Sequence, residues 1–246
     1  VFFIPLAIFT LQRLLPPLLL LRLTGIFLLG GLQGVIGWYM VQSGLVHDPW
    51  VSPLRLAMHL GLAFLIFALI LWTLLDVRYP GRALSFASSI PPSLLQLSRL
   101  TLLLLCIQIL LGALLAGLDG GLTYNTFPLM DGRFVPDGLL THTPWYENLY
   151  KNITLVQFSH RALALLLTVT IVIYALHALR QPLGRLREGF LLLLPVIGLQ
   201  FALGVATLLL HVPLTLALLH QLTALLLFSL CVALHHRLRS RPLHRR

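Results

Sequence analysis

The chain has 246 residues, of which 58% are hydrophobic and only 10% are charged, and its mean hydropathy is +0.93. A soluble domain carries about 25% charged residues, so this composition excludes an ordinary soluble domain and indicates a polytopic membrane protein. The net charge of +10 does not indicate nucleic-acid binding, because the basic residues occupy short loops and the C-terminal tail, which is the pattern of membrane-orientation signals.

Seven apolar segments follow one another along the chain. The first, residues 1–12, is shorter than the roughly 20 residues that a helix needs to cross a bilayer. Because the chain also opens on Val1 inside this apolar run, we expect this segment to be the end of a helix whose beginning is missing. The expected fold class is an all-α polytopic membrane protein. Its six complete spans are predicted at residues 22–42, 53–75, 94–117, 153–178, 189–210 and 214–238.

The connections on the two sides of the predicted membrane differ in charge. One side carries thirteen of the 17 basic residues and is predicted to be cytoplasmic by the positive-inside rule. We therefore expect a bacterial inner-membrane protein whose C-terminus is cytoplasmic. The thirteen residues are Arg13, Arg22, Arg78, Arg82, Arg99, Arg180, Arg185, Arg187, Arg237, Arg239, Arg241, Arg245 and Arg246.

The opposite, external side holds the longest connection, residues 118–152. A connection of this length is often functional. Its aromatic residues Trp145, Tyr146 and Tyr150 can equally form an aromatic belt at the membrane interface. Five of the seven acidic residues are on this side: Asp48, Asp119, Asp131, Asp137 and Glu147.

A short pattern recurs along the chain. A glutamine is followed four positions later by a glycine, an external turn follows, and a histidine comes early in the next span. Residues 31–71 and 198–232 both follow this order, which suggests duplication of a four-helix unit. We expect an incomplete first half at residues 1–93 and a complete second half at residues 94–246. The glutamine–glycine pairs are Gln33 and Gly37, Gln108 and Gly112, and Gln200 and Gly204.

Three histidines are predicted to lie at one depth in the membrane. His59, His160 and His220 each follow the start of a span by about seven residues, which is roughly 10 Å at 1.5 Å per residue. Imidazole is costly in lipid unless it faces a partner, and a layer of imidazoles is what axial ligation of haem in a helix bundle requires. The alternative is a core histidine that is hydrogen-bonded to a neighbouring carbonyl.

The second half contains two of these histidines, His160 and His220, which point inward from the same end of an up-and-down bundle. His59 is the repeat counterpart of His220, and its own partner would lie upstream of residue 1. Arg55 lies one turn outward from His59, and Arg161 follows His160. Each guanidinium can hold a haem propionate or can snorkel to the interface.

The remaining polar residues of the spans have less specific interpretations. The glycines of the repeated pairs are expected to allow close helix approach, and the glutamines to hydrogen-bond between helices. The sequence contains no phosphate loop, Cys-x-x-Cys pair, serine triad or paired intramembrane carboxylates. The other seven histidines are expected to be solvated or interfacial: His47, His142, His177, His211, His235, His236 and His244.

Several motifs together resemble the heme A synthase family, in the branch found in proteobacteria and mitochondria. They cover essentially the whole chain in the family's order. The motifs are the run from Gly31 to Leu45, Ser52-x-x-Arg55-Leu56-x-x-His59-Leu60, Ala116-Gly117-Leu118-Asp119, Tyr124-Asn125-Thr126-Phe127-Pro128-Leu129-Met130, Gln157-Phe158-x-His160-Arg161 and His220-Gln221.

The resemblance implies eight helices in two four-helix halves, with haem ligands toward the outer side. It implies that His160 and His220 hold haem b iron, and that the first half, with His59, takes haem O as substrate. The implied reaction oxidises the C8 methyl group of haem O to a formyl group, through successive hydroxylations and loss of water, and gives haem A for terminal oxidase assembly. The implied partners are an unidentified electron donor and the farnesyltransferase that makes haem O, and homo-oligomerisation stays open.

The chain departs from the family in its first half. The family carries a Glu-x-x-His-Arg motif there, at the position equivalent to Gln157-x-x-His160-Arg161, and this chain starts after that position. We therefore expect the full-length protein to be an enzyme and the 246-residue chain alone to be inactive.

Three other functions fit part of the pattern. An electron-transfer cytochrome would use haem b at His160 and His220 without modifying a second haem. A haem carrier or assembly partner of the terminal oxidase would bind haem without turnover. The external motif from Asn125 to Met130 and the retained His59 favour the synthase over both. A transporter is a weaker match, because the repeats are parallel and no pair of broken helices is evident.

Overall fold

The computed structural model describes residues 1–42, 51–79 and 90–239, and within these ranges every regular element is helical. The prediction of an all-α polytopic membrane protein is confirmed, since six helices are long and apolar enough to cross a bilayer. They are α2 (Pro17–Gln42), α3 (Pro53–Arg78), α4 (Pro92–Gly117), α6 (Ile153–Leu179), α7 (Leu186–Leu209) and α8 (Leu214–Arg239).

Two short α-helices and two 3-10 turns complete the described elements. The predicted partial span is α1 (Phe3–Leu11), and α5 (Asn148–Lys151) lies in the long connection that is predicted to be external. The 3-10 turns are Gly120–Leu122 and Trp145–Glu147. Proline stands at the start of α2, α3 and α4, where its missing N–H costs nothing and its fixed φ favours a helix. Several predicted residues lie outside the described ranges: Ser43, Gly44, Leu45, His47, Asp48, Arg82, Arg241, His244, Arg245 and Arg246.

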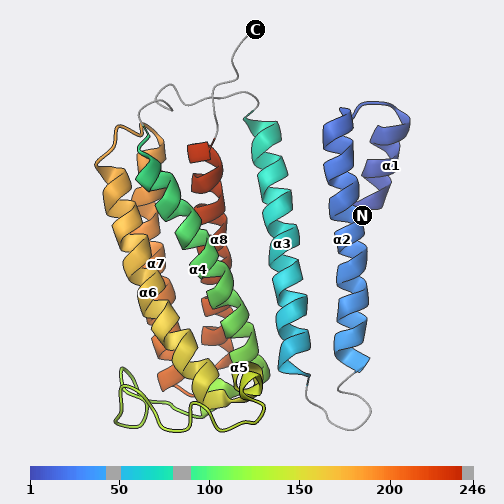
Figure 1. The fold of residues 1–246 in the computed structure, drawn as a ribbon. Helices are drawn as coiled ribbons and strands as arrows, with labels where there is room; N and C mark the ends of the chain where they lie inside the picture. The colour runs from blue at the N-terminus through green and yellow to red at the C-terminus, as the bar shows by residue number, and fades with distance from the viewer. Residues whose placement is uncertain (43–50, 80–89, 240–246) are drawn as a thin grey trace.

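Helices α4, α6, α7 and α8 form a ring in which each packs against two neighbours, and α6 is diagonal to α8 (Figure 1). Helix α3 packs on α4 and α8 at one side of this ring, α2 packs on α3, and α1 packs on α2. The apolar core lies inside the ring, where the buried rings of Tyr174 and Phe190 meet edge to face at 5.1 Å. Helix α2 contributes a single buried residue, Ile26.

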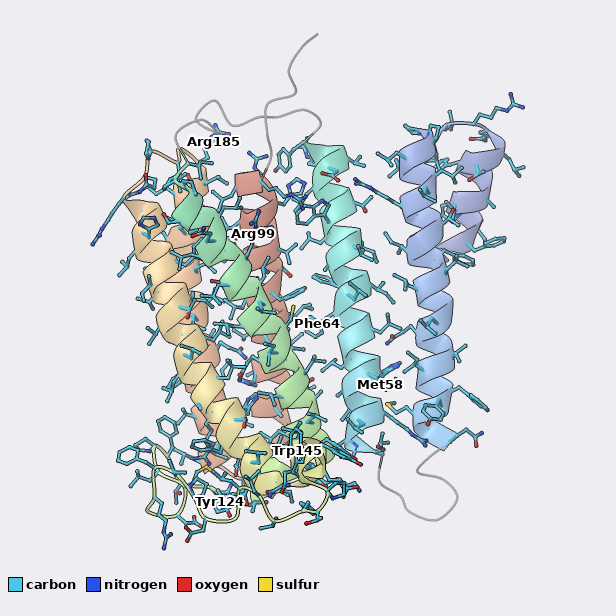
Figure 2. The ribbon with its side chains drawn as sticks, viewed as in Figure 1. Met58, Phe64, Arg99, Tyr124, Trp145 and Arg185 are labelled. Carbon is cyan, nitrogen blue, oxygen red and sulfur yellow. The ribbon has the colours of Figure 1, made fainter. Side chains whose placement is uncertain are left out.

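The two ends of the molecule differ in the way that the charge pattern predicts. Arg99 and Arg185 lie at the end of the molecule where α8 ends, whereas Tyr124 and Trp145 lie at the opposite end with the long connection (Figure 2). The starts of α3, α6 and α8 are all at this second end (Figure 1). The external connection therefore covers the end of the membrane domain that is closest to the three predicted ligands.

Candidate functional site

The three histidines occupy equivalent places near the starts of three helices. His59 lies in α3, His160 in α6 and His220 in α8, and each side chain is partly buried. Met58, the residue before His59, lies in the half of α3 that is nearer to the external connection (Figure 2). Each histidine faces the long helix that precedes its own: α2, α4 and α7, respectively.

A glutamine from that preceding helix contacts each imidazole. The amide nitrogen of Gln33 is 3.2 Å from Nε2 of His59 and 3.1 Å from its carbonyl oxygen. The amide nitrogen of Gln200 is 3.3 Å from Nε2 of His220. The expected interhelical hydrogen bonds of these glutamines are therefore present, and their partner is the histidine itself.

The amide nitrogen of the third glutamine lies close to three atoms of its histidine. The amide nitrogen of Gln108 is 3.1 Å from Nδ1 and 3.2 Å from Nε2 of His160, and it also donates to the carbonyl oxygen of His160 at 3.1 Å. A nitrogen at almost equal distances from both ring nitrogens is not in line with either lone pair, so the bond to the carbonyl oxygen is the one that links Gln108 to α6.

The glycine of each pair leaves room for the imidazole edge. A Cβ atom added at Gly37, Gly112 or Gly204 would lie 3.0, 3.2 or 2.9 Å, respectively, from Cε1 of the facing histidine. Carbon atoms pack at about 3.5–4.0 Å, so a side chain larger than hydrogen would push each ring away. The predicted close approach is confirmed: at each glycine, the helix backbone approaches the imidazole ring of the facing histidine.

His160 and His220 lie on diagonal helices of one ring. Both helices pack on α4 and α7. His59 belongs to the α2–α3 pair outside the ring. Among the described residues no three side chains of histidine, cysteine, aspartate or glutamate gather as a metal cluster, so the three histidines do not converge on a single ion.

The residues of the ring fit an axially ligated haem. In the ring, Nδ1 of His220 and the amide oxygens of Gln108 and Gln200 are buried without a hydrogen-bond partner. In the α2–α3 pair outside it, the same is true of Nδ1 of His59 and the amide oxygen of Gln33. Buried polar groups are normally paired, so these atoms mark a site that is organised for another group. Paired neutral imidazoles are suitable axial ligands for haem iron.

The two predicted propionate ligands contact protein groups. The guanidinium of Arg55 donates to the carbonyl oxygen of Tyr39 at 3.0 Å and lies 3.9 Å from the centre of the Tyr39 ring. The guanidinium of Arg161 donates to carbonyl oxygens of Tyr124 and Thr126, the latter at 2.8 Å. Arg161 thus ties the external connection to the start of α6, and the propionate role of both arginines stays a prediction.

Two asparagines that the sequence analysis did not single out organise the external connection. Asn148 is fully buried: its side-chain oxygen accepts from the backbone of Thr141 and His142 at 2.9 and 3.0 Å, and its amide donates to the carbonyls of His142 and Trp145. Asn152 caps the first turn of α6 and donates to Asn148 at 2.9 Å. An asparagine directly before an apolar run is a helix N-cap signal, which could have identified Asn152.

Two aromatic residues of this connection are exposed, and their place in an interfacial belt stays a prediction. Trp145 is 70% exposed and Tyr146 is 50% exposed. The neighbouring Lys151 donates to Glu147 at 2.8 Å, and this hydrogen bond raises the pKa of Lys151. The connection therefore presents an aromatic and charged surface around a core of asparagine hydrogen bonds.

Two histidines at the opposite end are buried, and the prediction of a solvated or interfacial position is wrong for them. His235 is 8% exposed and lies 2.9 Å from the hydroxyl of Ser98. His236 is 5% exposed, and its Nε2 is 2.7 Å from Asp76, which also pairs with Arg22. These partners come from α2, α3 and α4, so α8 is linked at this end to three other helices.

The other described histidines agree with the prediction. His142 and His211 are exposed, and His177 is partly exposed and lies 3.0 Å from the hydroxyl of Ser93. No ligand role follows for these three side chains.

Comparison with known proteins gives a consistent relationship over most of the chain. Residues 1–232 match the family described as cytochrome oxidase assembly protein (COX15-CtaA). A protein of Nitrosospira multiformis named heme A synthase is 48% identical over 239 residues, which are 97% of this chain and 67% of the relative. Proteins of the same name from Nitrosomonas eutropha and a Wolbachia pipientis of Culex pipiens are 44% and 42% identical over 93% of this chain. The chain spans 65% and 66% of the lengths of these two relatives.

Proposed function

Because the chain belongs to the family of cytochrome oxidase assembly proteins, we propose that the whole protein is a heme A synthase. It is a membrane oxidoreductase that converts the C8 methyl group of haem O to a formyl group, and its product, haem A, serves terminal oxidase assembly. The observation that carries the proposal is the recurrence of one imidazole environment, made of a glutamine and a glycine, in both parts of the chain.

Haem b is the resident cofactor of this proposal, and His160 and His220 would hold its iron. Their two helices are diagonal in the ring and share α4 and α7 as neighbours, which supports one group between them. Bound there, haem b would supply one-electron transfer. The apolar core of the ring begins seven positions beyond each histidine, at Leu167 in α6 and Leu227 in α8.

The substrate haem O belongs to the part of the chain around α2 and α3. His59 is its proposed iron ligand, and Gln33 and Gly37 hold the ring of His59 as their counterparts hold those of the other two histidines. Arg55, about one turn outward on the same helix, provides the positive charge for a propionate at the interface. Arg161 has the same role beside His160.

The organisation of the whole protein follows the same proposal. Residues 1–93 belong to the substrate half and residues 94–246 form the haem b half. The protein resides in a bacterial inner membrane with its C-terminus in the cytoplasm, where the basic residues gather. It receives haem O from a farnesyltransferase and electrons from a donor on the same membrane.

Analysis of extracted haem tests the proposal. The chain and a version extended upstream are each produced in cells that make haem O, and the haem is identified by pyridine haemochrome spectra and chromatography. The synthase predicts haem A from the extended version and haem b in both. Haem b without haem A from either version would instead support an electron-transfer or carrier protein.

A further inference from the structure

Helices α3 and α8 pack together, and both end at the same end of the molecule, away from the three histidines (Figure 1). Arginines gather there around aromatic rings. The guanidinium of Arg237 in α8 lies 4.3 Å from the centre of the Tyr79 ring, and that of Arg78 in α3 lies 5.8 Å from the same centre. The guanidinium of Arg239 lies 5.9 Å from the centre of the Trp72 ring. We call these five residues the arginine cluster.

Among the described residues, no acidic side chain pairs with the three arginines of this cluster. The carboxylate of Asp76, two positions before Arg78, already pairs with Arg22 and His236. The segments that follow α3 and α8, residues 80–89 and 240–246, contain no aspartate or glutamate in their sequence. The described part of the chain therefore leaves the positive charge of the arginine cluster without a counter-charge.

The surroundings of the arginine cluster suit a lipid better than a soluble anion. Arg78 and Arg239 are exposed. Leu74 and Ile70, four and eight positions before Arg78, lie on the same helical face and are 59% and 44% exposed. A phospholipid presents its phosphate at the membrane face and its acyl chains to the apolar surface beneath. The positive cluster above an exposed apolar stripe has the same order.

From this arrangement we propose that the arginine cluster binds the phosphate of an anionic phospholipid, such as phosphatidylglycerol. Basic pockets between membrane helices on the cytoplasmic side bind anionic head groups. The guanidinium fork suits phosphate oxygens, because it donates two parallel hydrogen bonds. Stacking on Tyr79 and Trp72 holds the guanidinium groups without using their N–H donors, which stay available to the phosphate.

The proposed lipid site goes beyond the proposed function, since it is independent of haem chemistry. A lipid bound there joins α3 to α8, which belong to the two proposed halves of the protein. The same arginines also count as orientation signals of the positive-inside rule, and that role requires charge but no defined geometry. The two roles are distinguishable, because a binding site depends on where the charges are and on the rings that hold them.

The first test measures binding of phosphatidylglycerol to the purified chain in detergent, by native mass spectrometry at increasing lipid concentration. The attraction of one arginine near the membrane surface corresponds to about fivefold in affinity, so Arg78→Gln/Arg237→Gln should bind about 25-fold more weakly. The matched control, Arg180→Gln/Arg185→Gln, removes the same charge from two exposed arginines between α6 and α7 and should bind like the wild type. Unchanged affinity in the first variant, or equal losses in both, would overturn the proposed site.

A second pair of variants keeps every charge and changes the ring that two arginines share. A cation–π contact at an exposed site corresponds to about 2- to 5-fold in affinity. Tyr79→Leu should therefore bind phosphatidylglycerol more weakly by about this factor, whereas Tyr79→Phe, which keeps the aromatic face, should bind like the wild type. Equal binding by these two variants would indicate a general attraction to positive charge and would contradict a site of defined geometry.

The identity of the ligand is tested on the wild type. Phosphatidylcholine carries its own positive charge beside the phosphate and should bind more weakly than phosphatidylglycerol. Inorganic phosphate at the same concentration should not displace the lipid, because it lacks acyl chains for the apolar stripe. Equal binding of phosphatidylcholine, or displacement by inorganic phosphate, would overturn the assignment to an anionic lipid. None of these measurements involves haem, so they fail or succeed independently of the proposed function.

Discussion

A methyl group added at Gly204 provides a stringent steric test of the site. The new Cβ of Gly204→Ala would lie 2.9 Å from Cε1, 3.5 Å from Nδ1 and 3.7 Å from Nε2 of His220. Since carbon atoms pack at about 3.5–4.0 Å, the ring must retreat by about 0.6–1 Å. Overpacking of this size costs about 1–3 kcal/mol. At 1.4 kcal/mol for each tenfold change, haem b affinity should fall by about 5- to 150-fold.

The assay is titration of the haem-free chain with haem b, followed by the low-spin absorption band. Gly198→Ala is the matched control, because Gly198 lies in the same helix and an added Cβ there meets no atom within 4 Å. It should keep wild-type affinity and, by replacing a helical glycine, add about 0.5–1 kcal/mol of stability. Equal affinity for Gly204→Ala and Gly198→Ala would refute the view that α7 approaches an imidazole that binds haem.

Three further changes test other parts of the structure. His160→Ala or His220→Ala should abolish the bis-imidazole haem b spectrum, whereas His59→Ala should leave it; a spectrum that persists in both of the first two variants would exclude this ligand pair. Asn148→Ala removes five hydrogen bonds and leaves buried groups unpaired at about 1–3 kcal/mol, so limited proteolysis should cleave residues 118–152 faster, and an unchanged rate would contradict its organising role. Asp76→Asn removes the charge that pairs with an arginine and a histidine; because Asp76 is 37% exposed, we expect a loss of about 1 kcal/mol in thermal unfolding, and full wild-type stability would show that this link contributes nothing.

The positions of the spans and the depth of the histidines could be predicted because both depend on local sequence. A bilayer requires long apolar runs, and proline marks the first residue of several helices. The predicted start at residue 53 matches α3, and the predicted starts at 153 and 214 match α6 and α8. The equal depth of the three imidazoles follows directly from these starts.

The partners of the histidines could not be predicted, because they depend on how helices rotate against one another. The Gln-x-x-x-Gly pattern was visible, but its interpretation as helix packing did not identify the imidazole as the group that packs. The error at His236 has the same origin. A histidine near a basic helix end is normally solvated, and its partner Asp76 lies 160 positions away in the sequence.

The centre of the external connection could not be predicted from the sequence either. Its aromatic residues stand out in the sequence, yet Asn148 forms its centre through contacts with turns that no periodic pattern predicts. Polar residues in irregular segments are recognised as structural only when their hydrogen-bond partners are known.

The pairing of each histidine with the immediately preceding long helix has a consequence for biogenesis. The pairs α2–α3, α4–α6 and α7–α8 are consecutive hairpins, so each imidazole can be oriented as soon as its own two helices have entered the membrane. Contacts close in sequence form before distant ones, and His160 and His220 meet only when two hairpins associate. We therefore expect the α7–α8 hairpin, made alone, to orient His220 as the whole chain does, which its ring ¹⁵N signals would reveal. Haem would then enter a bundle whose hairpins have each already placed an imidazole.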